Sequence, residues 1–316
     1  NRFGKPTNHN AETFFTAANF LSYGNKLYVV RAANTTATAD GTSVVLSAVA
    51  NTASVTNTQI QAATVNNQDD YDSSSFSTDI KYVAKYPGLI GNSLKISVCG
   101  TANAFTSTAN LNGGNANVSP GVLTTSIGNT VIRFALANSA TGTLAEANTQ
   151  ANTVLSTLTV GDYIKVGNTS IGEQYMKISA LDAAPQSNAT HRFVDITTES
   201  IYQLSTAFTA NTITRNWEYY NTVDGAPGQS KYQASFGNTA ASDEQHVVVV
   251  DQGGLFTGTP GTILEVFERV SRATDAKNED GSTNYYKTVI NDGSAYVWWA
   301  SDRAGAASAT AAAIIN

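Results

Sequence analysis

The residues best suited to chemistry in this chain are three histidines, His9, His191 and His246, and the carboxylates beside the last of them. Glu244 and His246 are two residues apart, so on a strand they would share one face, next to Asp243. Such a group could act as a general acid and base or bind a metal ion. The sequence has neither two histidines at metal-ligand spacing nor a Gly-x-Ser-x-Gly nucleophile motif. We therefore interpret the group as the polar entrance to a buried strand, and predict no catalytic and no metal-binding residue.

Four glycines, Gly253, Gly254, Gly258 and Gly261, precede a predicted helix, and the N-terminus of a helix can bind phosphate. A phosphate loop also needs a lysine after its last glycine, and a dinucleotide-binding turn needs three glycines at fixed spacing. Both features are missing from this stretch of sequence. No spacing singles out a pair of carboxylates for glycoside hydrolysis either. We therefore predict that these glycines form turns, that the chain uses no cofactor, and that it is not an enzyme.

An acidic run and a single cysteine are the remaining candidates for ion binding or redox chemistry. Residues 68–72 read Gln-Asp-Asp-Tyr-Asp, and Ca²⁺ sites gather carboxylates. The EF-hand spacing and its central glycine are missing, which favours a solvated acidic loop, while ion binding at Asp69, Asp70 and Asp72 stays open. Cys99 is the only cysteine, so the chain has no disulfide framework. It ends a strand-like segment, where we predict a small buried side chain rather than a reactive thiol.

The composition excludes several classes of partner. Charged residues make up 13% of the 316 residues, against roughly 25% in ordinary globular proteins, and the formal net charge is −6. This balance gives no electrostatic basis for binding nucleic acid or an anionic membrane. No apolar run approaches the roughly 18 residues of a membrane-spanning segment. Asn, Thr, Ser and Ala replace the charges, a profile that suits a β-rich surface lying against copies of itself.

The strongest secondary-structure signal is the stretch 243–272, which we predict to form the core of the fold. Its β-branched run 247–250 indicates a strand that is covered on both faces. After the glycines we predict a helix capped at Thr259 or Thr262. Its apolar stripe would be Ile263, Val266, Phe267 and Val270.

The other predicted elements follow from local patterns of apolar residues and turn residues. We predict helices over 10–23 and 144–158, and strands over 27–31, 94–99, 130–136, 162–166, 170–180 and 192–197. Residues 101–120 read as a low-complexity loop. Asn291-Asp292-Gly293 predicts a hairpin turn between strands 284–290 and 295–300. We interpret its aromatic residues as packing or subunit-contact surface: Tyr285, Tyr286, Trp298 and Trp299.

These elements predict an α+β fold that is mostly β. We expect a discontinuous scaffold domain, with strands and a few packed helices, made of residues 1–33, 79–100 and 217–316. Short strands at regular spacing indicate that residues 101–216 form an inserted outer domain, a small β-barrel or sandwich. Residues 34–78 would form a low-complexity loop or edge hairpins. The chain starts with Asn1 rather than Met and ends without an evident stop to the fold, so we also expect a fragment of a longer polypeptide.

Several stretches, spread from end to end of the chain, resemble one protein family. FGKPT at 3–7 and AANFLSYGNKLYVVRA at 17–32 resemble the start of the contractile tail sheath proteins of myoviruses, closest to the T4-like branch. YPGLIGNSLKI at 86–96 is similar to a second segment of these proteins. DEQHVVVVD at 243–251, GTPGTILE at 258–265 and SRATDAK at 271–277 are similar to the sheath proteins of cyanophages and related phages. Residues 101–216 match no motif of the family, and the family's C-terminal region is absent.

The resemblance implies a structural role without catalysis. Sheath subunits form a homo-oligomer of six-fold stacked rings around the tail tube protein, and a trigger at the baseplate makes them contract and drive the tube through the host envelope. The protein would then be part of the virion, made in the host cytoplasm, with no nucleic acid and no membrane as partner. A fragment without the C-terminal region would be monomeric. The alternative is a β-rich phage adhesin or receptor-binding module, with the aromatic hairpin as its ligand site.

Overall fold

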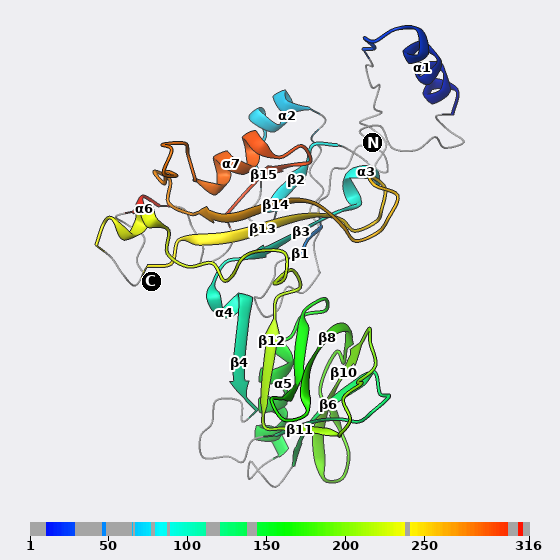
Figure 1. Ribbon diagram of the computed structural model, residues 1–316, viewed down its shortest axis with the longest axis vertical. Coiled ribbons are helices and arrows are strands. Elements are labelled where there is room, and N and C mark those ends of the chain that lie inside the picture. The colour runs from blue at the N-terminus through cyan, green and yellow to red at the C-terminus, as the bar shows by residue number, and fades with distance from the viewer. Residues whose placement is uncertain are drawn as a thin grey trace. The chain divides into compact units, whose positions relative to one another are not determined.

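The computed structural model describes residues 11–28, 46–48, 65, 67–76, 80–86, 89–111, 121–137, 144–237, 241–302 and 309–311 (Figure 1). The chain divides into two compact units. Unit 1 comprises Asn1–Ala48, Asn57–Val98 and Ser230–Asn316, and unit 2 comprises Val49–Thr56 and Cys99–Gln229. The fold is mostly β with few helices and several sheets, which confirms the predicted α+β class.

Unit 1 is built around a four-stranded sheet in the order β1-β3-β13-β14. Its strands are β1 Leu46–Ala48, β3 Leu94–Cys99, β13 Glu244–Asp251 and β14 Thr262–Ser271. All eight residues of β13 are buried, as its β-branched run predicted, and β3 is the strand predicted over 94–99. The burial pattern of β3 shows covered side chains on both of its faces. The core of this unit therefore lies against the middle of the sheet.

The predicted helix after the glycines is wrong, because this stretch is the strand β14, paired antiparallel with β13. The pairing register shifts twice, between Gln245 and Val247 and between Val249 and Val250, and at each shift β14 carries one extra residue. The extra residues break the alternation of period two, so the core-facing side chains of β14 come three residues apart: Leu264, Phe267 and Val270. That spacing imitates a helix in the sequence.

A helix and a short strand replace the predicted hairpin near the C-terminus. Residues 291–293 form the last turn of helix α7, Tyr286–Gly293, and strand β15, Val297–Trp299, pairs antiparallel with β2, Tyr82–Ala84. Lys85 stabilises the end of α7, because its Nζ donates to the carbonyl oxygens of Asn291 at 3.1 Å and Ser294 at 2.6 Å. The helical conformation of residues 291–293 is therefore stabilised by Lys85, a residue about 200 positions away in the sequence.

The remaining helices of unit 1 are α1 Ala11–Tyr23, α2 Gln68–Ser73, α3 Leu89–Asn92 and α6 Lys231–Ala234. The prediction of α1 is confirmed, and Gly24 ends it by donating its N–H to the Phe20 carbonyl at 2.9 Å. The acidic run is the short helix α2 rather than a loop, since the Asn67 side chain caps its first turn. The predicted strand 27–31 is not formed at 27–28, and its residues 29–31 lie outside the described residues.

Unit 2 contains a nine-stranded sheet, of which the strands β6, β7, β8 and β10 were predicted. Its elements in chain order are α4 Ala102–Phe105, β4 Thr106–Asn110, β5 Val122–Thr125, β6 Val131–Ala137, α5 Leu144–Ser156, β7 Tyr163–Asn168, β8 Gly172–Leu181, β9 Gln186–Ser187, β10 His191–Thr198, β11 Phe208–Ala210 and β12 Thr212–Asn216. Residues 102–110 form α4 and β4, so the predicted loop is wrong there, and residues 112–120 lie outside the described residues.

The sheet of unit 2 closes into a barrel through the continuous segment β11–β12. The first part of this segment pairs with β5 and the second part with β7. The strand order is β11-β5-β6-β10-β8-β7-β12-β4. Only Asn211 separates β11, which pairs with β5, from β12, which pairs with β7. The interior is apolar and includes Ile132, Phe134 and Met176, with the buried side of α5 packed onto it. Between the two alternatives of a small barrel or a sandwich, this topology is that of a barrel.

Candidate functional site

The histidine that was the first candidate for catalysis is a buried structural group. His246 lies on β13 with 0% of its surface exposed, and its Nδ1 accepts a hydrogen bond from the backbone N–H of Arg269 on β14 at 3.0 Å. Arg269 in turn donates from Nη1 to Glu244 at 3.2 Å. His191 begins β10 in unit 2, with its Nδ1 2.8 Å from the Thr190 hydroxyl. His9 lies outside the described residues.

The carboxylate of Asp243 fastens three segments of unit 1 to one another. It accepts hydrogen bonds from the backbone N–H and the hydroxyl of Ser230, both at 2.8 Å, and from the hydroxyl of Ser271. Asp243 is fully buried, and these donors compensate its negative charge. The arrangement joins the start of β13 to the end of β14 and to the cap of α6, and no histidine takes part in these three bonds.

The glycine-rich loop between β13 and β14 is organised around the carboxylate of Asp251. This carboxylate accepts from the backbone N–H of Phe256 at 3.0 Å, from the N–H and hydroxyl of Thr257 at 2.7 and 2.9 Å, and from the hydroxyl of Ser93. Gly254 and Gly261, at φ 74° and 81°, donate their N–H groups to the Asp251 carbonyl. The amides that would hold a phosphate are therefore bonded within the loop, which supports the interpretation of these glycines as turn residues.

The ionisation of Asp251 follows from these contacts. Burial acts to raise its pKa, but the hydrogen bonds from Ser93, Thr257 and Phe256 together outweigh burial and hold the pKa below its ordinary value. Because the folded pKa is lower than the unfolded one, the charged carboxylate stabilises the fold above the ordinary pKa. That contribution is lost as the pH falls through the folded pKa.

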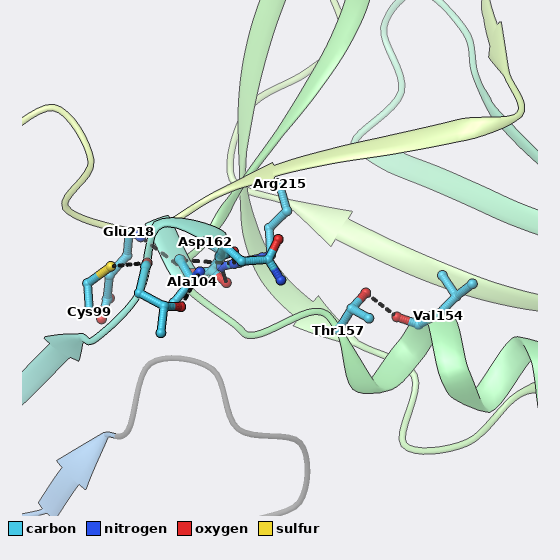
Figure 2. Close-up of polar contacts among 9 residues, drawn as sticks. Cys99, Ala104, Val154, Thr157, Asp162, Arg215 and Glu218 are labelled. Carbon is cyan, nitrogen blue, oxygen red and sulfur yellow. Dashed lines mark hydrogen bonds and ion pairs between the residues drawn. The ribbon is translucent and has the colours of Figure 1, made fainter. Parts of the chain in front are cut away.

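A buried ion pair is the equivalent polar centre of unit 2 (Figure 2). Arg215 on β12 donates from Nη1 to Asp162 Oδ2 at 2.8 Å, and the two side chains are 2% and 4% exposed. Its Nη2 donates to the carbonyl oxygens of Asn103 at 3.1 Å and Ala104 at 2.9 Å in α4. Asp162 Oδ1 accepts the backbone N–H of Glu218 at 3.2 Å. One guanidinium therefore connects α4, β12 and the start of β7.

Burial raises the pKa of Asp162 to about 6, although Arg215 opposes the shift. A folded pKa above the unfolded one means that stability from this group is fully present below the unfolded pKa. It is lost as the pH rises through about 6. We therefore expect the D162N variant, which has no proton to lose, to gain stability relative to the wild type as the pH rises from about 4 to about 7. Urea unfolding of both proteins over this range measures the difference, and two parallel curves would contradict the assignment.

The other candidates were the acidic run at 68–72 and the single cysteine. No group of three or more His, Cys, Asp or Glu residues that could hold a metal ion occurs among the described residues. Cys99 is buried, with its Sγ donating to the Thr101 carbonyl at 3.6 Å. This confirms the prediction of a small buried side chain. Within the described ranges, no helix is both long and apolar enough to cross a bilayer.

The aromatic residues near the C-terminus are largely part of the core of unit 1. Tyr286 and Trp298 are 4% and 5% exposed. Trp299 donates from its ring nitrogen to the Tyr286 hydroxyl at 2.7 Å, and Lys287 lies over the Trp299 ring at 3.6 Å. The interpretation of these residues as packing is therefore correct, although they lie on a helix and a strand and not on a hairpin. An exposed aromatic hairpin, the ligand site expected of an adhesin, is not formed.

Comparison with known proteins relates the chain to a structural protein of a virus. The chain is 27% identical over 305 residues to the tail sheath protein of Salmonella phage ViI. The match covers 94% of this chain and 41% of that protein, so the chain spans less than half the length of the relative. No family model matches, and no solved structure matches.

The sequence predicted the buried strand β13. It did not predict the hydrogen-bond network of Asp251 in unit 1 or the buried ion pair of Arg215 and Asp162 in unit 2. The signal for Arg215 lies in the segment Thr-Ile-Thr-Arg-Asn, where the arginine alternates with Thr214 on the same face as Ile213. An arginine on the inward face of a strand requires a buried acceptor, although the sequence does not reveal which one. The signal for Asp251 is a carboxylate placed directly after four buried valines.

Proposed function

We propose that this chain is part of the subunit of a bacteriophage contractile tail sheath. The subunit polymerises around the tail tube and contracts to drive the tube through the host envelope. The observation that carries the proposal is the similarity to a phage tail sheath protein over 94% of the chain. The order of the family-like segments along the sequence agrees with it.

The finer parts of the proposal rest on the resemblance of these segments to the T4-like and cyanophage sheath proteins. The complete subunit assembles into six-fold stacked rings, with the tail tube protein and the baseplate as partners. It is made in the host cytoplasm and ends in the tail of the virion. The role is structural and not enzymatic, which agrees with the use of Asp162, Asp243 and Asp251 in hydrogen bonds that hold segments together.

Electron microscopy of the complete gene product, purified alone at high concentration, tests this function. We expect long hollow tubes, because sheath subunits carry their own assembly contacts. The matched control is the chain 1–316 under identical conditions, which we expect to stay monomeric in light scattering. A complete product that remains monomeric or trimeric and binds a host glycan would contradict the proposal.

A further inference from the structure

We propose that His246 is a proton-sensitive latch that holds helix α7 to the sheet of unit 1. The latch acts through one residue, Arg269, whose two peptide groups are held from opposite sides. Its N–H donates to His246 Nδ1 at 3.0 Å, and its carbonyl oxygen accepts from the Asn284 side chain at 3.1 Å. Asn284 stands two residues before the start of α7 at Tyr286.

The geometry fixes the protonation state that the closed latch requires. An imidazole nitrogen that accepts a hydrogen bond from a backbone N–H carries no proton of its own, so His246 is neutral with its proton on Nε2. Protonation of Nδ1 would place its N–H against the backbone N–H of Arg269, so that two donors face each other and the hydrogen bond is lost. The side chain has no exposed surface, so water cannot take over the lost bond without an opening of the strand pair.

The backbone of Arg269 has an unusual conformation at an irregular point of the pairing between β13 and β14. Arg269 is the non-glycine residue with positive φ among the described residues, at φ 52°. It lies where the register of β13 and β14 shifts between Gln245 and Val247. A residue with a side chain adopts this conformation only when its surroundings hold it there. Loss of the His246 bond removes one of the two contacts that hold the Arg269 backbone, so relaxation of Arg269 and loss of its bond to Asn284 follow together.

Charged side chains of the same strand pair are bonded to Arg269. Arg269 bonds both nearby glutamates, with Nη1 at 3.2 Å from Glu244 and Nε at 3.6 Å from Glu268. Apart from His246, the charged and titratable side chains in this part of the sheet lie on β13 and its two neighbouring strands. They are Asp243, directly before β13, Glu244 and Asp251 on β13, Glu265, Glu268 and Arg269 on β14, and Lys95 and Cys99 on β3.

The connection to α7 continues through the backbone. Ser271 donates its N–H to the Asn284 carbonyl at 2.9 Å, so residue 284 is bonded on both its side chain and its main chain to the end of β14. Opening at Arg269 removes one of these two bonds. We therefore expect residues 284–293 to become less protected when His246 takes up a proton, while the buried centre of β13 stays protected.

Hydrogen–deuterium exchange of segment 284–293, corrected for the intrinsic effect of pH on exchange, tests the latch. Between about pH 7.5 and about pH 5 we expect the protection of this segment to fall, by up to tenfold per pH unit below the ordinary titration range of histidine near 6.5. The H246Q variant, whose amide oxygen can accept the Arg269 N–H but takes up no proton, should keep its protection throughout. The matched control H191Q, at a histidine of β10 in unit 2, should behave as the wild type.

Two results would overturn the latch. One is protection of 284–293 in the wild type that does not change with pH, and the other is an H246Q variant that keeps the full pH dependence. Imidazole nitrogen NMR of the wild type gives a second measurement, which holds even if H246Q fails to fold. We expect Nδ1 to stay unprotonated in every molecule in which segment 284–293 is closed, because the closed latch needs Nδ1 as an acceptor. A folded and protected protein with a proton on Nδ1 excludes the mechanism.

Discussion

Replacing Arg215 with methionine is expected to destabilise unit 2 by about 3–5 kcal/mol at neutral pH, the cost of leaving a buried charge without its partner. The substitution keeps most of the side-chain volume but leaves the Asp162 carboxylate, 4% exposed, without its cation. It also removes the donor to the carbonyl oxygens of Asn103 and Ala104, which join α4 to β12. Urea unfolding, with hydrogen exchange to localise the effect to residues 99–229, measures the loss.

The ion pair between Arg133 and Asp195 provides the matched control on the same barrel. Its atoms are 2.6 Å apart, but the two side chains are 48% and 26% exposed. Solvent screens such a pair, so R133M should cost at most about 1 kcal/mol. The double variant D162N/R215M should recover part of the stability that R215M loses, because it removes both buried charges. An R215M variant no less stable than R133M would show that burial of the pair has no energetic consequence.

The D251A variant is expected to destabilise unit 1 by about 3–5 kcal/mol, in the range of a broken buried hydrogen-bond network. The change removes the acceptor of the Phe256 and Thr257 amides and of two hydroxyl groups. Those amides lie in a tight loop in which Gly254 and Gly258 adopt positive φ. Exchange of residues 252–261 should rise together with the loss measured by urea.

Asp280 is the control for this experiment, because it makes the same kind of contact at the surface. Its Oδ1 accepts from the N–H of Ser282 at 2.9 Å and from the hydroxyl at 2.6 Å, in an exposed turn. Water can replace these bonds, so D280A should leave the urea midpoint nearly unchanged. Equal losses in D251A and D280A would show that the Asp251 network does not hold the loop.

The parts of the fold that were predictable from the sequence are those whose structure is decided locally. The strand β13 carries a β-branched run, and α5 carries an apolar stripe at helical spacing. The strand β14 was misread because two register shifts against β13 give its core residues a spacing of three. The turn at residues 291–293 was misread because Lys85, far away in sequence, holds the end of a helix there.

The hydrogen-bond partners of the buried polar residues could not be predicted from the sequence either. Residue type and position showed that Asp243 and His246 enter a buried strand, but pairing decided what each carboxylate or imidazole contacts. Arg215 bonds Asp162, which is 53 positions away in the sequence, and Ser93 bonds Asp251, which is 158 positions away. No local pattern contains such information, since it depends on the register of strands brought together by the fold.

The barrel of unit 2 also sets the order of events when the protein is made. Its closing segment, β11 and β12, is the last of its strands in the chain, and β12 pairs with β4, the first. Thr108 and Thr214, whose hydroxyls meet across this seam at 2.9 Å, are 106 positions apart. During synthesis the ribosome must therefore deliver the whole domain before the seam can form. Contacts so distant in sequence slow folding, so we expect this seam to form after the strand pairs that are neighbours in sequence, such as β7 and β8.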